Sequence, residues 1–264
     1  MVPDDSGGGL SHIQQIQTAE ELKMFIAHHA QSRHSDASRT WQWPLVLILY
    51  LLLAVPGIPA LLIILLLLGQ SWLPAELLSL VNPRYLQTPA PILLHAGSGV
   101  LFFLMVPLQF SARLRQRMPR WHRHSGRLAL CSGLLMAASG IWMHHFLTPA
   151  DLGPRYLGLW ALSLTIIGCF SMAFYRVRQR RFIAHQRWMC RGLAAVLATL
   201  SGLLLELVAA LTLGQLDGWQ LAVSQWQHDY ARLTALGLNL LVLEAYWRRQ
   251  TTPELEVINQ HELT

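Results

Sequence analysis

Six blocks of apolar residues constrain this chain more than any other feature of its sequence. They cover roughly 43–69, 90–110, 128–147, 155–175, 190–214 and 231–247. Most reach the ~20 residues that an α-helix needs to cross the hydrocarbon core of a bilayer, and the last is near the lower limit. Charged residues make up only 13% of the 264 residues, about half of their share in soluble proteins. The sequence therefore predicts an all-α, polytopic membrane bundle with six transmembrane helices.

The distribution of basic residues predicts the orientation of this bundle. Twelve of the 20 Lys and Arg residues fall within 113–127 and 176–191, and neither stretch contains an acidic residue. Short loops rich in arginine stay in the cytoplasm, so the loops after the second and fourth helices face inward. Six crossings then place both termini in the cytoplasm. Because the net charge of +6 is concentrated in these two loops, it indicates membrane topology and no nucleic-acid partner.

The chain divides into a central membrane domain and two polar tails. Residues 41–249 form the predicted six-helix domain, and residues 250–264 form a cytoplasmic polar tail. Residues 1–40 form the other cytoplasmic tail. Thr18 and Glu21 within it have the spacing of a capping box, which predicts a short interfacial helix.

Histidines near the predicted outer surface are the first candidate site. His95 lies about one turn into the second helix, and His144 and His145 lie near the end of the third. Gly99 and Gly140 each lie four residues deeper than a histidine, on the same helical face. Two imidazoles with room for a flat porphyrin suit a b-type haem, with His95 and either His144 or His145 as axial ligands. The alternative is that these histidines form local hydrogen bonds and that the glycines serve helix packing.

A carboxyl group within the fifth helix is a candidate for supporting this site. Glu206 ends a stripe of small residues spaced four apart, at roughly the depth of His95. It could accept a hydrogen bond from an imidazole N–H or relay a proton, and a carboxyl kept neutral by burial is the equal alternative.

A second cluster lies at the predicted inner surface, where His122 and His185 begin the third and fifth helices. His122 precedes His144 by 22 residues, about 33 Å of helix, which exceeds the ~30 Å hydrocarbon core. This cluster is therefore expected at headgroup depth rather than around a haem within the membrane. It is suited to a quinone headgroup, an anionic headgroup or plain anchoring. Its other members are His124, Arg123, Arg127, Arg187 and Arg191.

Three motifs carry a resemblance to a known family. They are "HAGSG" at 95–99, "HRHSGR" at 122–127 and "HQRWMCR" at 185–191. In this order they resemble an uncharacterised, domain-of-unknown-function family of bacterial integral membrane proteins with H-x-x-x-G, H-R-x-x-G-R and H-x-x-W-M-x-R motifs. The resemblance covers about residues 90–210 and implies a multi-pass protein of the bacterial inner membrane. The singled-out residues are His95, Gly99, His122, Arg123, Gly126, Arg127, His185, Trp188, Met189 and Arg191.

The layout also resembles, more distantly, the ferric-reductase-like and di-haem b-type cytochromes, in which histidines of neighbouring helices bind haem. His144 and His145 match none of the three motifs.

The function predicted from these observations is electron transfer in the membrane, with haem b or quinone as the cofactor. Partner membrane subunits or a redox protein would exchange electrons with it. The alternative is a non-redox protein, either a lipid-binding accessory subunit or a small transporter. The stripe ending at Glu206 and the repeated tetrapeptide PRYL at 83–86 and 154–157 favour that alternative.

Overall fold

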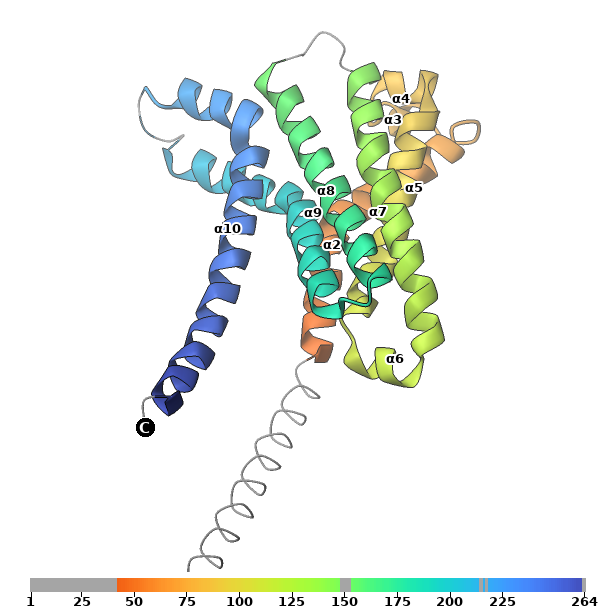
Figure 1. The fold of residues 1–264 in the computed structure, drawn as a ribbon. Helices are drawn as coiled ribbons and strands as arrows, with labels where there is room; N and C mark the ends of the chain where they lie inside the picture. The colour runs from red at the N-terminus through yellow and green to blue at the C-terminus, as the bar shows by residue number, and fades with distance from the viewer. Residues whose placement is uncertain (1–41, 148–152, 214–215, 217, 263–264) are drawn as a thin grey trace, which may run out of the picture.

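A computed structural model describes residues 42–147, 153–213, 216 and 218–262, and all regular structure in these residues is helical (Figure 1). The predicted all-α class is therefore confirmed. The predicted interfacial helix within residues 1–40 lies outside the described residues. The helices are α2 (Gln42–Leu68), α3 (Ala75–Leu78), α4 (Pro83–Gln87), α5 (Pro89–Gln109), α6 (Ala112–Arg117), α7 (Pro119–Leu147), α8 (Pro154–Arg178), α9 (Phe182–Leu211) and α10 (Gln220–Glu262).

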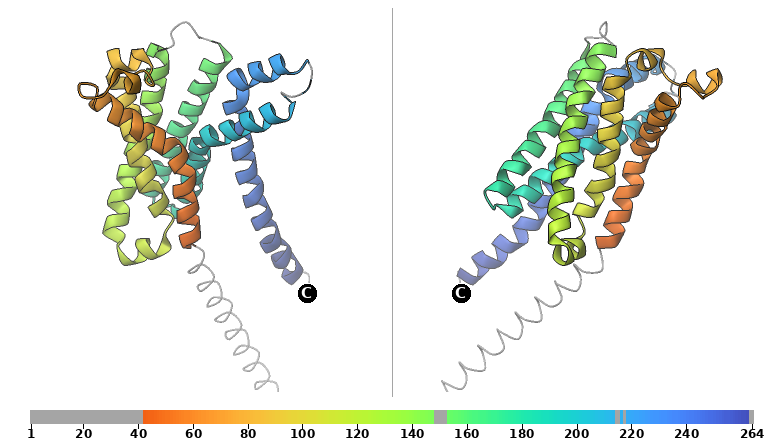
Figure 2. Two further views of the ribbon diagram at one scale, coloured as in Figure 1. Left: turned by 180° about the vertical axis from the view of Figure 1, so that it is seen from behind. Right: turned by 90° about the vertical axis from the view of Figure 1, so that its right-hand side faces the viewer.

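The long helices run alternately up and down. One end of the bundle carries α3 and α4, and we call it the outer end after the predicted topology (Figure 1). The other end, called the inner end, carries α6 and the turn between α8 and α9. The start of α2 lies at this inner end, and α10 runs back to it. The end of α9 and the start of α10 lean to one side of the bundle, as Figure 1 and the left view of Figure 2 show.

Five helices of the described chain are long and apolar enough to cross a membrane. They comprise 43–68, 89–109, 119–145, 154–178 and 182–211. They correspond to the first five predicted crossings. The sixth predicted crossing lies within α10, where Arg232, Asn239 and Glu244 interrupt the apolar run. The predicted polar tail at 250–264 is helical up to Glu262, as the continuation of α10.

Two helices begin well before their apolar blocks. Helix α7 begins at Pro119, although its apolar block begins near residue 128, and α9 begins at Phe182, ahead of a block that begins near 190. Proline is favoured at the first position of a helix, because its fixed φ suits a helix and its missing N–H costs nothing there. The basic motifs are therefore the first turns of two long helices, which continue past the apolar zone at the inner end.

The core lies where α5, α7, α8 and α9 meet around two aromatic rings. Phe102 of α5 and Phe170 of α8 are fully buried, with ring centroids 5.5 Å apart. Gly133 of α7 and Gly192 of α9 flank Phe170, and a Cβ on either glycine would overlap that ring. Because both positions are glycine, α7 and α9 can pack closely against the two aromatic rings. This packing sets how closely the four helices approach one another.

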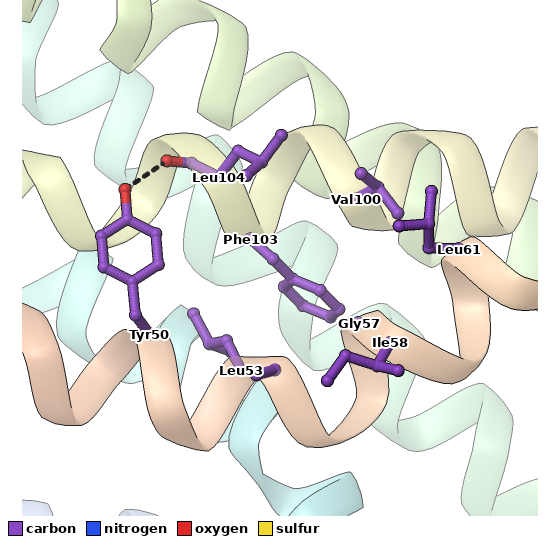
Figure 3. A pocket seen from close by; sticks show the side chains of 9 residues that line it. Tyr50, Leu53, Gly57, Ile58, Leu61, Val100, Phe103 and Leu104 are labelled. Atoms are coloured by element: carbon purple, nitrogen blue, oxygen red, sulfur yellow. Dashed lines mark hydrogen bonds between the residues drawn. The ribbon is translucent and has the colours of Figure 1, made fainter.

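Helix α2 lies at the edge of the bundle and is the least buried of the five apolar helices. It contains two internal prolines, Pro56 and Pro59. Its packing against α5 leaves an apolar groove of about 190 Å³, shown in Figure 3. The ring of Phe103 points toward Gly57, where a Cβ would lie 3.1 Å from it, and the hydroxyl of Tyr50 donates to the carbonyl of Leu104 at 2.9 Å.

Candidate functional site

The imidazole of His95 is wedged against α7. Its Nδ1 lies 2.9 Å from the carbonyl oxygen of Met136, and a Cβ on Gly140 would lie 3.2 Å from its Cε1. Because a carbonyl only accepts hydrogen bonds, Nδ1 carries the proton and Nε2 keeps its lone pair. Gly99, one turn further along α5, faces the side chain of Met136, and a Cβ on Gly99 would lie 3.5 Å from the Met136 sulfur. His95 is thus a half-buried link between α5 and α7.

The other two outer histidines turn toward α8. The ring of His144 stacks on Tyr156, with centroids 5.7 Å apart, and Nδ1 of His145 lies 2.9 Å from the hydroxyl of Tyr156. His95 contacts α7 one to two turns deeper, at Gly140 and Met136. The structure therefore does not bring His95 and His144 face to face across an open gap.

These contacts bear on the fit of a haem between the outer histidines. The two glycines that were expected to leave space for a porphyrin instead face Met136 and the ring of His95. An axial pair needs the thickness of a porphyrin between its imidazoles, and His95 packs directly on the backbone of α7. This arrangement does not fit a haem at that pair, and haem binding there stays a prediction.

Among the described residues, no hydrogen bond or ion pair joins Glu206 to His95. Its backbone carbonyl accepts a hydrogen bond from Gln227 of α10 at 2.6 Å, and its carboxylate acts on Arg232 of the same helix. The N–H of His95 is already donated to Met136. Within the described chain, Glu206 therefore belongs to the contact between α9 and α10.

The structure brings the inner histidines together. His122 in the first turn of α7 lies within electrostatic range of His185 in the first turn of α9, and of Arg115 and Arg123. Nδ1 of His185 lies 2.9 Å from the carbonyl oxygen of Ala173 of α8, so Nδ1 carries the proton here as well. Nδ1 of His122 is buried and has no hydrogen-bond partner among the described residues. Among the buried histidine nitrogens of the described chain, this is the one without a hydrogen-bond partner.

The predicted ring of arginines divides into two groups. Arg123 and Arg127 are exposed on α7. Arg191 of α9 instead pairs with Glu244 of α10, with Nε 2.6 Å from Oε1, and its guanidinium lies 4.7 Å from the ring centroid of Trp188. Arg187 lies over Trp247 of α10 at 5.8 Å. Arg187, Arg191 and Trp188 therefore join α9 to α10 rather than surround the histidines.

The spacing of Glu244 and Arg248 suggests an i,i+4 pair on α10, but the hydrogen-bonded partner of Glu244 is Arg191. The charge of Arg248 also acts on Glu244.

Near His122 and His185, α5 and α7 are joined by a hydrogen bond that the sequence motifs did not predict. Gln109 at the end of α5 donates from Nε2 to the hydroxyl of Ser125 at 2.9 Å, and Ser125 donates to the carbonyl of Trp121 at 2.8 Å. A Cβ on Gly126 would lie 3.0 Å from Oε1 of Gln109. The serine and glycine of "HRHSGR" therefore hold α7 against α5, which fixes the first turn that carries His122.

A comparison with protein families identifies the relatives of this bundle. The family model described as "Predicted membrane protein (DUF2306)" matches residues 92–226, slightly more than half of the chain. The chain belongs to this family. No curated protein and no solved structure matches it. In this DUF2306 protein the match spans α5 to α9 and the start of α10, while α2 and both ends of the chain lie outside it.

All three motifs lie within the DUF2306 segment, and so do both histidine clusters. Of the two, the inner cluster is better suited to bind a ligand. It combines an imidazole nitrogen without a partner, a second imidazole whose tautomer is fixed, and nearby positive charge from Arg115 and Arg123. Such a group can donate one hydrogen bond to an oxygen atom and stabilise negative charge that builds on it.

Proposed function

We propose that this DUF2306 protein binds the oxygen-bearing ring of a membrane quinone at its inner end and serves in electron transfer. The observation that carries the proposal is the buried, unpartnered Nδ1 of His122 beside His185. A buried polar atom without a hydrogen bond costs about 1–3 kcal/mol, so a ligand that satisfies it recovers this free energy.

The chemistry of the cluster favours a carbonyl oxygen on an apolar ring. A phosphate has several charged oxygens and would be satisfied by the exposed arginines of α7 alone. Nδ1 of His122 is instead a single buried nitrogen, which suits a single oxygen of an otherwise apolar group. It lies at the level where the first turn of α7 leaves the apolar zone. Positive charge from Arg115 and Arg123 would favour electron density on that oxygen.

A second candidate function is the binding of anionic lipid headgroups. A shallow hollow of about 530 Å³ at the turn between α8 and α9 is lined by Arg180, Arg181 and Arg187, together with Phe182 and Ile183. Phe182 and Ile183 are exposed. Arginines beside exposed apolar side chains suit an acidic headgroup at the cytoplasmic leaflet.

The proposal includes six crossings, with both termini in the cytoplasm of a bacterial cell. The course of α10 supports this count, since α10 packs along α9 and runs back to the inner end (Figure 1). Asn239 of α10 also donates to the carbonyl of Ala194 at 3.0 Å and accepts from Ser201 at 3.1 Å. Polar side chains that are satisfied between two helices are typical of packed membrane bundles.

Titration of the detergent-purified protein with a short-tailed benzoquinone, followed by tryptophan fluorescence, tests the proposal. His122→Gln is expected to weaken binding about tenfold, the worth of one buried hydrogen bond. His124→Gln, an exposed histidine two residues away, is the matched control and should bind like the parent. Equal affinity in the parent and His122→Gln would overturn the quinone assignment.

Two further measurements separate the other candidates. Retention by phosphatidylglycerol vesicles that is lost in an Arg180→Gln, Arg181→Gln double variant would favour lipid binding. A Soret absorption band that His95→Ala removes would favour haem b over quinone.

A further inference from the structure

Three charged side chains from three different helices converge near the outer end of the bundle. Arg155 lies in the first turn of α8, Glu206 lies near the end of α9, and Arg232 lies on α10. All three are half-buried. The charged groups that act on the guanidinium of Arg232 are Arg155 and Glu206. Arg155 and Arg232 have no part in the histidine clusters.

Two glycines bring α10 close enough to form this group. A Cβ on Gly202 of α9 would lie 3.6 Å from both Cα and Cγ of Arg232, and a Cβ on Gly158 of α8 would lie 3.2 Å from Cγ of Leu233. The backbone of α10 at 232–233 therefore packs against α8 and α9 together. Arg155 lies three residues before Gly158, and Glu206 lies four after Gly202, so each side chain shares the helix face that meets α10.

Among the described residues, the charges of this group do not balance. Two guanidinium groups face one carboxylate, and no ion pair joins Glu206 to either arginine within the described chain. Nε of Arg155 is buried and has no hydrogen-bond partner among the same residues. The next acid on α10, Asp229, is hydrogen-bonded to His228 at 2.8 Å and is not among the charges that act on Arg232.

We infer that Arg155 and Arg232 form a binding site for an oxyanion, a phosphate or a carboxylate, between α8, α9 and α10. Two like charges held close together are unfavourable until an anion lies between them. A guanidinium presents donors in a planar fork that matches two oxygens of a phosphate or carboxylate, and buried Nε of Arg155 would gain its missing acceptor. Glu206 limits the net positive charge of the empty site.

The ligand could come from the bilayer or from solution. Arg155 lies in the first turn of α8, at the level of lipid headgroups in the predicted topology, so a phosphatidylglycerol headgroup could reach it. A soluble phosphate could reach the same level from outside. Both present the same oxyanion, and the experiment below separates them.

The experiment measures binding of inorganic phosphate and of phosphatidylglycerol to the full-length protein. Phosphate is titrated against the detergent-purified protein, and its dissociation constant is read from the rise in Tm. Phosphatidylglycerol is titrated at zero phosphate and counted as retained lipid by native mass spectrometry, with phosphatidylcholine for comparison. Arg232→Gln and Arg155→Gln are each expected to weaken the bound probe about tenfold or more, as expected for one charge-assisted hydrogen bond. Arg84→Gln removes an arginine from α4 at the same end and should leave the affinity unchanged.

Glu206→Gln gives the opposite sign and so excludes a merely structural effect. Removing the carboxylate of Glu206 raises the net charge of the site, so the oxyanion should bind several-fold more tightly. This variant also keeps the inference testable if the arginine variants do not fold. Saturable phosphate binding would assign a soluble ligand, and retention of phosphatidylglycerol alone would assign a lipid. Failure of both probes to bind the parent protein would overturn the inference, as would weaker binding in Glu206→Gln. Because quinone binding depends on the inner end, either proposal can fail without the other.

Discussion

The imidazole of His95 rests on the backbone of Gly140, where a Cβ would lie 3.2 Å from its Cε1. A methyl group at this position has to displace the ring, because a contact of 3.2 Å is shorter than ordinary van der Waals packing allows. The ring is also held by the hydrogen bond from Nδ1 to Met136. At this contact between α5 and α7, residue 140 therefore has no room for a side chain while His95 keeps its position.

Gly140→Ala should lower the free energy of unfolding by about 1–2 kcal/mol, because the added methyl group overpacks this contact and weakens the hydrogen bond. Gly97→Ala, on the helix that carries His95, is the control, since a Cβ there meets no atom within 4 Å. Thermal unfolding in detergent measures both. A stability loss of the same size in Gly97→Ala would contradict the account.

The aromatic core makes a sharper prediction. Gly192→Ala should destabilise the protein by about 1–3 kcal/mol, because the new methyl group would overlap the ring of Phe170. Adding Phe170→Leu should recover part of the loss by vacating that space, so the double variant is more stable than the sum of the two single changes. Gly168→Ala, which meets no neighbour within 4 Å, serves as the control. Strict additivity would show that the two positions do not share the space.

The contact between α9 and α10 around Arg191 depends on the planar guanidinium group of that side chain. Arg191 pairs with Glu244 and lies over Trp188 and Trp247, at 4.7 and 5.1 Å from their ring centroids. Arg191→Lys keeps the charge but loses the planar fork, and we expect a loss of about 1 kcal/mol in stability. Arg123→Lys, at an exposed position of α7, should change little. Equal melting temperatures for the parent and Arg191→Lys would show that the charge alone suffices.

The course of α10 predicts which residues face the same side of the membrane. In a variant without its three native cysteines, single cysteines at Gln179 and Gln250 should react with an impermeant maleimide from one side, and a cysteine at Ser79 from the other. All three positions are exposed. Labelling of Gln250 from the side of Ser79 would mean that α10 does not cross.

Composition and block length were sufficient to predict the helical class and five of the apolar helices, because a membrane span must satisfy all its backbone groups internally. Hydropathy alone did not include 119–127 and 182–189, since it cannot detect a helix that continues beyond the apolar zone. His122 and His185 were nevertheless expected to begin the third and fifth helices, and they lie in the first turns of α7 and α9. The contacts of His95 could not be predicted either. Its spacing to Gly99 was visible in the sequence, but the partner of an imidazole depends on the rotation of two helices about their axes.

The surroundings of Arg232 could not be predicted from the sequence, for a different reason. It lies at the edge of the last apolar block, where an arginine is expected to reach toward the surface. Its proximity to Arg155, 77 positions earlier, depends on how Gly158 and Gly202 admit α10. The positions of Arg155 and Arg232 in the sequence do not reveal how closely α10 packs against α8 and α9.

His95 and His185 share one arrangement, in which Nδ1 donates to a carbonyl oxygen of a neighbouring helix. Each ring is therefore prevented from exchanging its tautomer or turning over while the helices stay packed. Any proton that either histidine receives must arrive at Nε2, from one direction only. The two imidazoles are one-sided bases, and their orientation is set by helix packing rather than by another side chain.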